Sequence, residues 1–350
     1  MKVAPLIWQL RKERGGNSNN SASWKLIHTG QHYDYEMSKV FFEELDIPEP
    51  DYFLGAGSGT HAEQTAKVMV EFEGVCLREK PDVVAVVGDV NSTLACSVTA
   101  KKLNIKVAHV EAGLRSNDMS MPEEINRIVT DSIADYLFVS EKSGIENLKR
   151  EGKDVKQIFF VGNIMIDTLY HSLGKLIHSQ DSSKITKPYA VVTLHRPSNV
   201  DEKEKLKDIL LALGEISNDM NIYFPIHPRT EKNVEKFSLN SLLEDTHIKL
   251  IPPMSYLEFL ALWKNAALVL TDSGGIQEET TALGIPCFTI RENTERPITI
   301  AEGTNTLVGT TGKEILKAYK SFKKGEKKEG TIPAFWDGKT AQRIIKILVD

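Results

Sequence analysis

Short apolar runs alternate with longer stretches of mixed polarity along the whole chain. Runs rich in β-branched residues predict buried strands at Val83–Val87, Ile105–Val110, Tyr136–Val139, Ile158–Val161, Tyr189–Leu194, Asn221–Ile226, Ile248–Ile251, Ala267–Leu270 and Cys287–Ile290. The stretches between them predict helices at Glu63–Arg78, Leu94–Leu103, Glu204–Ile216 and Tyr256–Lys264. Continuously apolar strands that alternate with helices are typical of parallel sheets covered on both faces. The sequence therefore predicts an α/β fold of doubly wound, Rossmann-like sheets.

The length of the chain indicates two domains. Its 350 residues suffice for two hydrophobic cores, each in a domain of roughly 150 residues. The stretch 181–188, Asp-Ser-Ser-Lys-Ile-Thr-Lys-Pro, is polar and ends in proline, which is typical of a linker or loop between the halves. We expect an N-terminal domain over 1–167 and a C-terminal domain over 168–337.

Composition and charge narrow the class of protein. The net charge of −5 leaves no basic stripe, which argues against nucleic acid as a partner. No apolar run approaches the ~18 residues of a membrane span, so we expect no membrane partner. The three cysteines, Cys76, Cys96 and Cys287, lie far apart in or beside apolar runs, which predicts buried thiols in a reducing compartment. We therefore expect a cytoplasmic protein.

Unusual polar residues follow several of the predicted strands. Asp89 follows the first of them, Glu111 the second, His195 the strand that opens the second half, and Asp272 a later one. Ligands of open α/β sheets bind beyond the carboxyl ends of the strands. Together these residues predict a cleft between the two domains, lined by two carboxylates of the first half and a histidine of the second. For any one of them taken alone, a helix cap or a loop salt bridge is an equally good interpretation.

The segment Asp272–Glu279, Asp-Ser-Gly-Gly-Ile-Gln-Glu-Glu, is the most specific local signal. A strand ends, Gly274 and Gly275 allow a close approach of the backbone, and a helix begins. Free N–H groups and the helix dipole at such a point suit a phosphate or pyrophosphate. Glu279, about one turn into the helix, has the right position to accept hydrogen bonds from ribose hydroxyls. The alternative is an ordinary Ser-capped helix after a glycine-rich turn.

A third feature is Pro122-Glu-Glu-Ile-Asn-Arg127. Proline at a helix start with two acids behind it is a standard N-terminus, so complementarity with the helix dipole alone explains it. Glu123 and Arg127, four residues apart, also share a helix face. With Asp89 and Glu111 they would form a group of acids that raise one another's pKa, as general acid–base chemistry requires. His227 either joins this site or caps a surface helix.

Taken together, the motifs resemble one family. They are GDVNST (88–93), HVEAGLRS (109–116), MPEEINR (121–127), VGNIMIDT (161–168), TLHRPSNVD (193–201), DSGGIQEET (272–280), RENTERP (291–297) and EGTNTLVG (302–309). They resemble, in order and over nearly the whole chain, the non-hydrolysing UDP-N-acetylglucosamine 2-epimerases. The combination is highly specific, although no single motif is.

The resemblance implies a GT-B-like pair of domains with the nucleotide in the interdomain cleft, and a last helix at about 338–350 that packs back on the first domain. It implies an isomerase that interconverts UDP-GlcNAc and UDP-ManNAc through 2-acetamidoglucal and feeds cell-surface polysaccharide or glycan synthesis. It implies a homodimer that needs neither a metal nor a nicotinamide cofactor. The implied catalytic set is Asp89, Glu111, Glu123, His195 and Arg127; the implied UDP-binding set is Lys2, Ser273, Gly274, Gly275, Glu279 and Arg296.

The chain departs from the family pattern at its start. Members open with an apolar strand and a Gly-Thr-Arg-Pro-Glu turn before the lysine that Lys2 matches, whereas this chain begins inside the first helix. We therefore expect the first strand of the N-terminal sheet to be missing and the activity of the chain to suffer. Gln31-His32 matches a regulatory Gln-His pair of the family only in part.

Four alternatives stay open at this point. They are a hydrolysing epimerase, a GT-B glycosyltransferase, an inactive UDP-sugar binder, and an epimerase of a related sugar such as a 2,3-diacetamido uronic acid.

Overall fold

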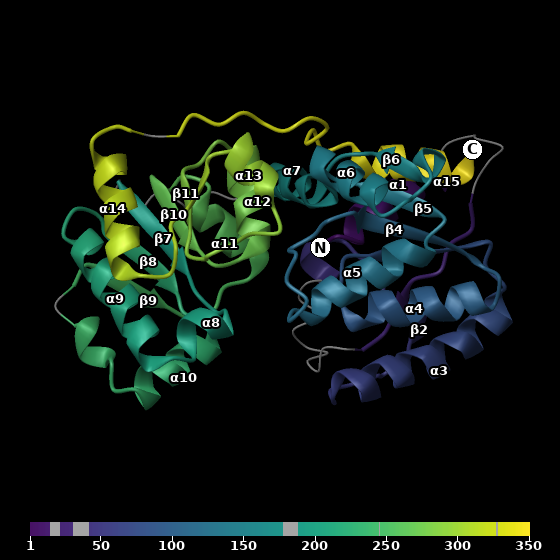
Figure 1. The fold of residues 1–350 in the computed structure, drawn as a ribbon, viewed down its shortest axis with the longest axis horizontal. Coiled ribbons are helices and arrows are strands. Elements are labelled where there is room, and N and C mark those ends of the chain that lie inside the picture. Colours follow the sequence, from purple (N-terminus) through teal and green to yellow (C-terminus); the bar gives the residue numbers. More distant parts are fainter. Residues whose placement is uncertain (15–21, 31–41, 178–187, 245, 327) are drawn as a thin grey trace. The chain divides into compact units, whose positions relative to one another are not determined.

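The computed structural model describes residues 1–14, 22–30, 42–177, 188–244, 246–326 and 328–350. The chain folds as two compact units, one formed by Met1–His171 with Ala334–Asp350 and the other by Ser172–Pro333. We call them unit 1 and unit 2 (Figure 1). The boundary after residue 167 lies inside helix α7 (Ile164–Ile177) and stays a prediction. The predicted linker at 181–188, apart from Pro188, lies outside the described residues.

Unit 1 contains a parallel sheet whose strands follow one another in chain order. The strands are β3 (Val83–Val87), β4 (Lys106–Ala112), β5 (Tyr136–Val139) and β6 (Ile158–Phe160). Two short strands, β1 (Ile27–His28) and β2 (Tyr52–Phe53), form a separate parallel pair. The helices of unit 1 are α1 (Ala4–Arg14), α3 (His61–Glu79), α4 (Asn91–Lys102), α5 (Pro122–Ile133), α6 (Lys142–Arg150), most of α7, and α15 (Thr340–Val349), with a 3-10 turn at Val155–Gln157.

Alternating side chains of the unit 1 strands enter two different cores. Val84 and Val86 of β3 pack in a cluster that includes Phe72 of α3. Val110 of β4 packs on the other face of the sheet, in a cluster that includes Ile344 of α15. Residues i and i+2 of a strand point to the same face, so apolar residues at successive positions pack on opposite faces of the sheet. The last helix of the chain is thereby part of the first unit (Figure 1).

Unit 2 is built on a six-stranded parallel sheet of order β12-β11-β10-β7-β8-β9. Its strands are β7 (Tyr189–Thr193), β8 (Asn221–Pro225), β9 (Ile248–Ile251), β10 (Leu268–Thr271), β11 (Cys287–Thr289) and β12 (Asn305–Leu307). The chain starts in the middle at β7, runs outward to β9, and returns to β10 on the other side of β7. The carboxyl ends of β7 and β10 therefore form the topological switch point, where doubly wound sheets bind ligands.

The helices of unit 2 cover this sheet. They are α8 (Pro197–Val200), α9 (Lys203–Ser217), α10 (Pro228–Lys236), α11 (Tyr256–Trp263), α12 (Gly274–Ala282), α13 (Pro297–Ala301) and α14 (Gly312–Lys323), with a 3-10 turn at Asn240–Leu242. Helices α9 and α14 form a hydrophobic core with the strands of the sheet. The starts of α11 and α14 are closed by capping boxes, Ser255 with Glu258 and Thr311 with Glu314. Each box satisfies two N–H groups that the helix itself leaves open.

The predicted α/β class with parallel sheets is confirmed, and each of the nine predicted strands matches an observed one to within three residues at either end. The sequence missed β1, β2 and β12, which have only two or three residues. Such strands are too short to show a pattern of their own, so their pairing with a neighbour defines them.

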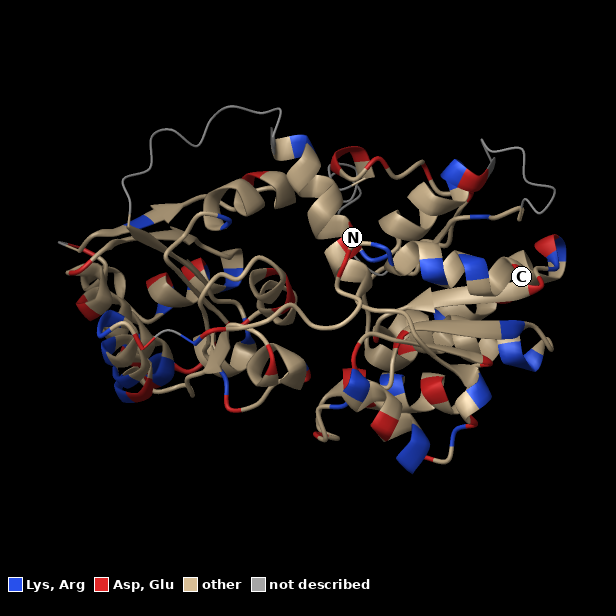
Figure 2. Cartoon of the chain, turned by 90° about the horizontal axis from the view of Figure 1, so that it is seen from above, with Lys and Arg blue, Asp and Glu red and all other residues tan. Residues whose placement is uncertain are grey.

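The surface and the thiols agree with the composition. Acidic and basic residues are interspersed over both units (Figure 2). In the described part of the chain, no helix is both long and apolar enough to cross a membrane. All three cysteines are buried and unpaired, as predicted.

Candidate active site

Glu111 occupies an unusual backbone position at the end of β4. The pairing of β4 with β5 shifts register between Val110 and Ala112, which leaves Glu111 as the extra residue of a β-bulge. Its φ of +73° lies in the left-handed region, where a residue with a side chain costs of order 1–3 kcal/mol. Backbone strain of this kind gathers at functional sites, so the bulge supports the sequence prediction for Glu111.

Lys2 contacts this glutamate. The Nζ atom of Lys2 lies 2.5 Å from Oε2 of Glu111, whose side chain is only 4% exposed. Gly88, just after β3, has a φ of +77°, and a Cβ atom there would stand 3.2 Å from Nζ of Lys2. A glycine at position 88 therefore lets the lysine reach the glutamate. A residue predicted to bind UDP, Lys2, thus contacts a residue predicted to be catalytic, Glu111.

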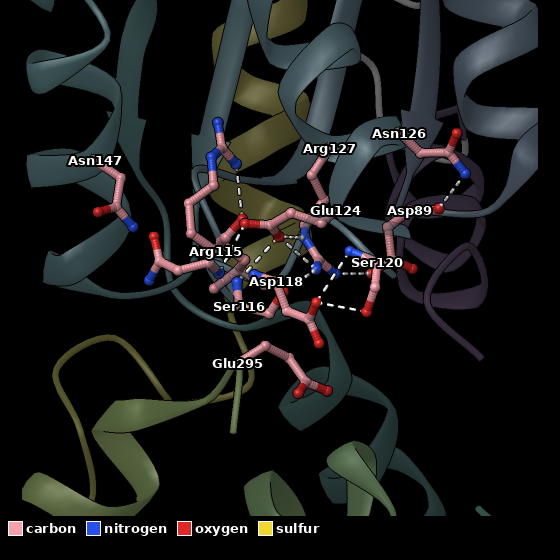
Figure 3. Close-up of polar contacts among 12 residues, drawn as sticks. Asp89, Arg115, Ser116, Asp118, Ser120, Glu124, Asn126, Arg127, Asn147 and Glu295 are labelled. Carbon is pink, nitrogen blue, oxygen red and sulfur yellow. Dashed lines mark hydrogen bonds and ion pairs between the residues drawn. The ribbon is translucent and has the colours of Figure 1, made fainter. Parts of the chain in front are cut away.

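Asp89 and Arg127 form a second ion pair of unit 1. Arg127 of α5 donates from Nη1 to Oδ2 of Asp89 at 2.5 Å, while its Nε and Nη2 donate to Glu124 at 3.0 and 2.6 Å (Figure 3). The sequence placed Glu123 and Arg127 on one helix face; in the structure Arg127 pairs with the buried Glu124, whereas Glu123 is exposed. The orientation of α5 against the sheet turns position 124 inward. Asn126 of the same helix donates to the carbonyl of Asp89 at 2.9 Å.

The surroundings of Glu124 keep its carboxyl charged. Burial alone raises the pKa of the Glu124 carboxyl, but hydrogen bonds from Ser116, Arg127 and Asn117 outweigh it and lower the pKa. Glu124 is therefore a charged structural partner of Arg127.

Unit 1 also contains a fully buried histidine–aspartate pair, His109 and Asp131. His109 of β4 contacts Oδ1 of Asp131 through Nδ1 at 2.6 Å and the carbonyl of Gly88 through Nε2 at 2.9 Å. The other oxygen of Asp131 accepts from the backbone N–H of Gly113 at 3.0 Å and lies 2.7 Å from Nη2 of Arg115. Burial alone lowers the pKa of His109, but Asp131 and the Gly88 carbonyl outweigh burial and raise the pKa above its ordinary value.

His195 stands at the topological switch point of unit 2. Thr193 of β7 pairs with Thr271 of β10, so His195 and Asp272 follow neighbouring strand ends. Asp272 is fully buried and accepts from the backbone N–H groups of His195 and Arg196 at 3.0 and 2.9 Å. Nδ1 of the His195 ring lies 3.1 Å from Oδ1 of Asp272, while 39% of the histidine side chain stays exposed. The carboxylate holds the ring, and the rest of the imidazole is accessible.

The Asp272 carboxyl is charged in this arrangement. Burial alone raises its pKa, but hydrogen bonds from the His195 side chain and from the two backbone N–H groups outweigh burial and lower the pKa. Asn199 of α8 donates to the same carboxylate at 3.2 Å.

His227 takes the second of its two predicted roles. Its Nδ1 accepts from the backbone N–H of Arg229 at 3.1 Å, which makes it the N-cap of α10. Its ring also lies 5.6 Å from that of His195, centroid to centroid. Burial and the neighbouring His195 lower the pKa of His227.

Helix α12 begins at the predicted glycines. Ser273 is the N-cap, but its side chain accepts no capping hydrogen bond, so the alternative of a Ser-capped helix does not hold. Gly274 allows a close approach of another residue, since a Cβ atom there would lie 2.9 Å from Oε1 of Glu295. Although burial raises it, Arg296 and Arg291 lower the pKa of Glu295 to about 2. A carboxylate thus lies beside the start of this helix.

The two remaining UDP-site predictions lie deeper than the sequence suggested. Glu279 is 1% exposed and accepts from the hydroxyl of Tyr256 at 2.7 Å. Burial raises the pKa of Glu279 to about 8, against the Tyr256 hydrogen bond. Arg296 is also buried, and its Nε lies 2.6 Å from Oε1 of Glu278. Among the described residues, no group of three or more His, Cys, Asp or Glu side chains is placed to hold a metal ion.

Comparison with known proteins places these features in a family. The model of the UDP-N-acetylglucosamine 2-epimerase family matches residues 16–349. The UDP-N-acetylglucosamine 2-epimerase of Methanocaldococcus jannaschii is 47% identical over 358 aligned positions, which cover 99% of this chain and 95% of that protein. The UDP-2,3-diacetamido-2,3-dideoxy-D-glucuronate 2-epimerase of Pseudomonas aeruginosa is 40% identical and covers 92% of this chain and 90% of its own length.

The fold agrees with the sequences. A crystal structure of the M. jannaschii UDP-GlcNAc 2-epimerase in complex with UDP-GlcNAc and UDP matches with a TM-score of 0.88 at 46% identity, over 99% of this chain and 95% of that one. The chain belongs to the UDP-N-acetylglucosamine 2-epimerase family. The resemblance to its non-hydrolysing members and the GT-B-like fold are thereby confirmed.

One expectation about the family pattern is corrected. We expected the chain to lack the first strand and turn of its relatives, but the alignments run over 99% of this chain and 95% of the M. jannaschii protein. The expected loss is not borne out by these matches. Lys2 lies just before α1 and reaches Glu111. The Gln31-His32 pair lies outside the described residues.

The sequence missed several residues that hold the site together. His109, Asp131 and Tyr256 attracted no prediction, and Asp272 was expected at a strand end of the cleft but not as the residue that holds His195. His109 carries the one available signal, since a histidine in the middle of an apolar strand needs a buried polar partner. That partner is a residue of α5, which the sequence alone does not identify.

Proposed function

We propose that the chain interconverts UDP-GlcNAc and UDP-ManNAc by elimination and re-addition of UDP. The C–O bond at C1 breaks and UDP leaves with the electron pair, while a base removes the C2 proton and a C1=C2 double bond forms. The double bond then takes a proton on the opposite face of C2, and UDP re-forms the C1–O bond. Full-length similarity to a UDP-GlcNAc 2-epimerase supports the reaction. The ion-paired carboxylates Glu111 and Asp89 carry the proposal.

Unit 1 supplies the acid–base groups in this proposal. Asp89, Glu111 and Glu123 move protons at C2, a contribution of about 10²–10⁴-fold to the rate for well-placed groups. Lys2 and Arg127 balance the charge of Glu111 and Asp89.

Unit 2 supplies the nucleotide site and His195. The N–H groups at the start of α12, with Ser273, Gly274 and Gly275, bind the diphosphate as helix N-termini do. Arg296 contributes a cation, and Glu279 accepts from the ribose in exchange for the Tyr256 hydroxyl. His195, held through Asp272 and part-exposed, acts on the reacting sugar or its leaving group.

The proposal is tested by following the purified protein with UDP-GlcNAc by NMR. We expect UDP-ManNAc to accumulate to equilibrium, with deuterium at C2 when the solvent is ²H₂O. Accumulation of free UDP and ManNAc would instead indicate a hydrolysing enzyme. If the substrate stayed unchanged, the protein would be a UDP-sugar binder without this activity. Calorimetry tests the proposed nucleotide site. Glu279→Ala should weaken UDP binding by about 1–3 kcal/mol. As a control, Glu235→Ala, which replaces an exposed residue of α10, should leave UDP binding unchanged.

A second substrate is supported by one relative. The P. aeruginosa protein named for a UDP-2,3-diacetamido glucuronate is 40% identical to this chain. A panel that contains both UDP-GlcNAc and this uronate distinguishes the two, and we expect the higher kcat/KM for UDP-GlcNAc because the M. jannaschii protein is more similar.

We further propose that the chain works in the cytoplasm as a homodimer. Helix α3 carries an exposed apolar stripe in which Val70 and Leu77 are 69% and 59% exposed. Gly74 lies between them, and a Cβ atom at this position would meet open space, with no neighbouring atom within 4 Å. A helix face of this kind suits a two-fold contact with a second copy. Light scattering should show a dimer, and Val70→Glu should convert it to a monomer.

A further inference from the structure

One buried pair holds the backbone on which two proposed catalytic carboxylates stand. His109 donates from Nε2 to the carbonyl of Gly88, the residue just before Asp89. Its partner Asp131 accepts from the N–H of Gly113, two residues after Glu111. The ends of β3 and β4 are thus tied to one carboxylate on helix α5.

The hydrogen bonds require a charged pair. The carbonyl of Gly88 and the carboxylate of Asp131 can only accept, so both ring nitrogens of His109 must donate. A neutral imidazole would turn a lone pair toward one of the two acceptors. Asp131 in turn lies between two cations, His109 and Arg115, and Arg115 is shared with Glu151 at 2.7 Å. Each oxygen of Asp131 therefore accepts from a cation.

The same contacts enclose the bulge. Glu111 lies with a positive φ between His109 and Gly113, and both of these residues are bonded to Asp131. A strained residue persists only where its surroundings over-determine it. The contact to Asp131 on each side supplies that constraint.

We propose that His109 and Asp131 are positioning residues that fix Asp89 and Glu111 for the reaction without touching the substrate. This rests on the proposed function. A misplacement of a reacting group by about 1 Å costs of order 10²-fold in rate, so losing the pair lowers kcat much more than it changes binding of the nucleotide, which is assigned to unit 2.

The test compares two polar variants with a matched core variant. His109→Gln keeps a donor toward Gly88, and Asp131→Asn keeps the shape of the side chain. Leu148→Ala serves as the control, because Leu148 is a fully buried residue of the unit 1 core that touches none of these groups by a polar contact. We expect kcat to fall at least tenfold in both polar variants, with KM and the UDP dissociation constant changed by less than about twofold. Leu148→Ala lowers the thermal midpoint but keeps kcat.

Two further readouts keep the outcomes separate. Amide hydrogen exchange at 88–89 and 111–113 should accelerate in His109→Gln and stay unchanged in Leu148→Ala. Wild-type kcat in both polar variants, unchanged exchange, or a loss of kcat that Leu148→Ala shares would overturn the positioning role. A wild-type protein without turnover would refute the proposed function instead, and the exchange data would still decide whether the pair positions these segments.

Discussion

The two units use a buried aspartate for the same task but surround it with different charges. Asp131 of unit 1 accepts from the backbone next to Glu111, and Asp272 of unit 2 accepts from the backbone of His195. Asp131 is flanked by the cations His109 and Arg115. Asp272 accepts from two backbone N–H groups and the amide of Asn199, and the ring of the part-exposed His195 lies beside it.

The difference follows from where each aspartate sits in the fold. Asp272 directly follows β10 beside the end of β7, so backbone N–H groups of the next loop already point at it. Asp131 reaches the strand ends from helix α5, with one backbone N–H within its range. A carboxylate with few amide donors needs cations to stay charged when buried. Asp131 is therefore the costlier of the two to remove, because its loss leaves buried charges without a counter-ion.

Replacing each aspartate by asparagine gives the largest expected effect. Asp131→Asn should lower the free energy of unfolding by about 3–5 kcal/mol, since it leaves two buried cations partly uncompensated. Asp272→Asn should cost about 1–3 kcal/mol, as expected for an unsatisfied backbone group. Urea unfolding of both variants measures this, and equal losses would remove the distinction between the two units.

Glu123→Gln and Glu124→Gln sharpen the comparison within unit 1. Glu124→Gln should lower the free energy of unfolding by about 1.5–3 kcal/mol, because it removes a buried charged acceptor of Arg127. Glu123→Gln should leave stability unchanged and reduce turnover by about 10²-fold or more, as expected for a general acid or base. Thermal midpoints and kcat for both variants decide the roles, and a fully active Glu123→Gln protein would remove Glu123 from the catalytic set.

Glu279 gives unit 2 a pH dependence of its own. Its pKa of about 8 in the fold lies above the ordinary 4.5, so the unfolded chain loses this proton first as the pH rises. Its stabilising contribution is complete below about pH 4.5 and is lost as the pH rises to about 8. Glu279→Gln, which cannot ionise, should therefore show a smaller fall in thermal midpoint between pH 5 and 8, by a few degrees. Identical pH profiles for the two proteins would show that Glu279 ionises normally.

His227→Ala should have the smallest effect. The variant loses the N-cap of α10, at about 1 kcal/mol of stability. We expect turnover close to wild type, because His227 supports His195 only through ring contact. A large drop in kcat with normal stability would assign His227 to the reaction, alongside His195.

Most of the fold was predictable because its strands are short, nearly continuous apolar runs, several of them buried on both faces. A run such as Val83–Val87 contains no polar residue and is too short for a helix, so its composition alone predicts a strand. The ends of such strands are equally clear, since a polar residue after an apolar run marks the edge of the sheet. Asp89, Glu111 and His195 were found in this way.

Pairing within the site was less predictable. Spacing along α5 placed Glu123 and Arg127 on one helix face and suggested no role for Glu124, yet the structure pairs Arg127 with Glu124. Both spacings bring side chains together on a helix, and only the direction from which the sheet covers the helix selects one. The sequence was equally limited for Glu279. Its position within α12 could be predicted, but nothing in the sequence indicated that its side chain is buried against Tyr256.

The sequence by itself determined the family, the strand order along the chain and the candidate carboxylates, because each depends on residue type within a short window. Tertiary structure alone decided which groups hold those carboxylates. His109 meets Asp131 across 22 residues, and His195 meets Asp272 across 77. Such contacts depend on which strands and helices lie side by side and in what register, and a short window of sequence carries no record of either.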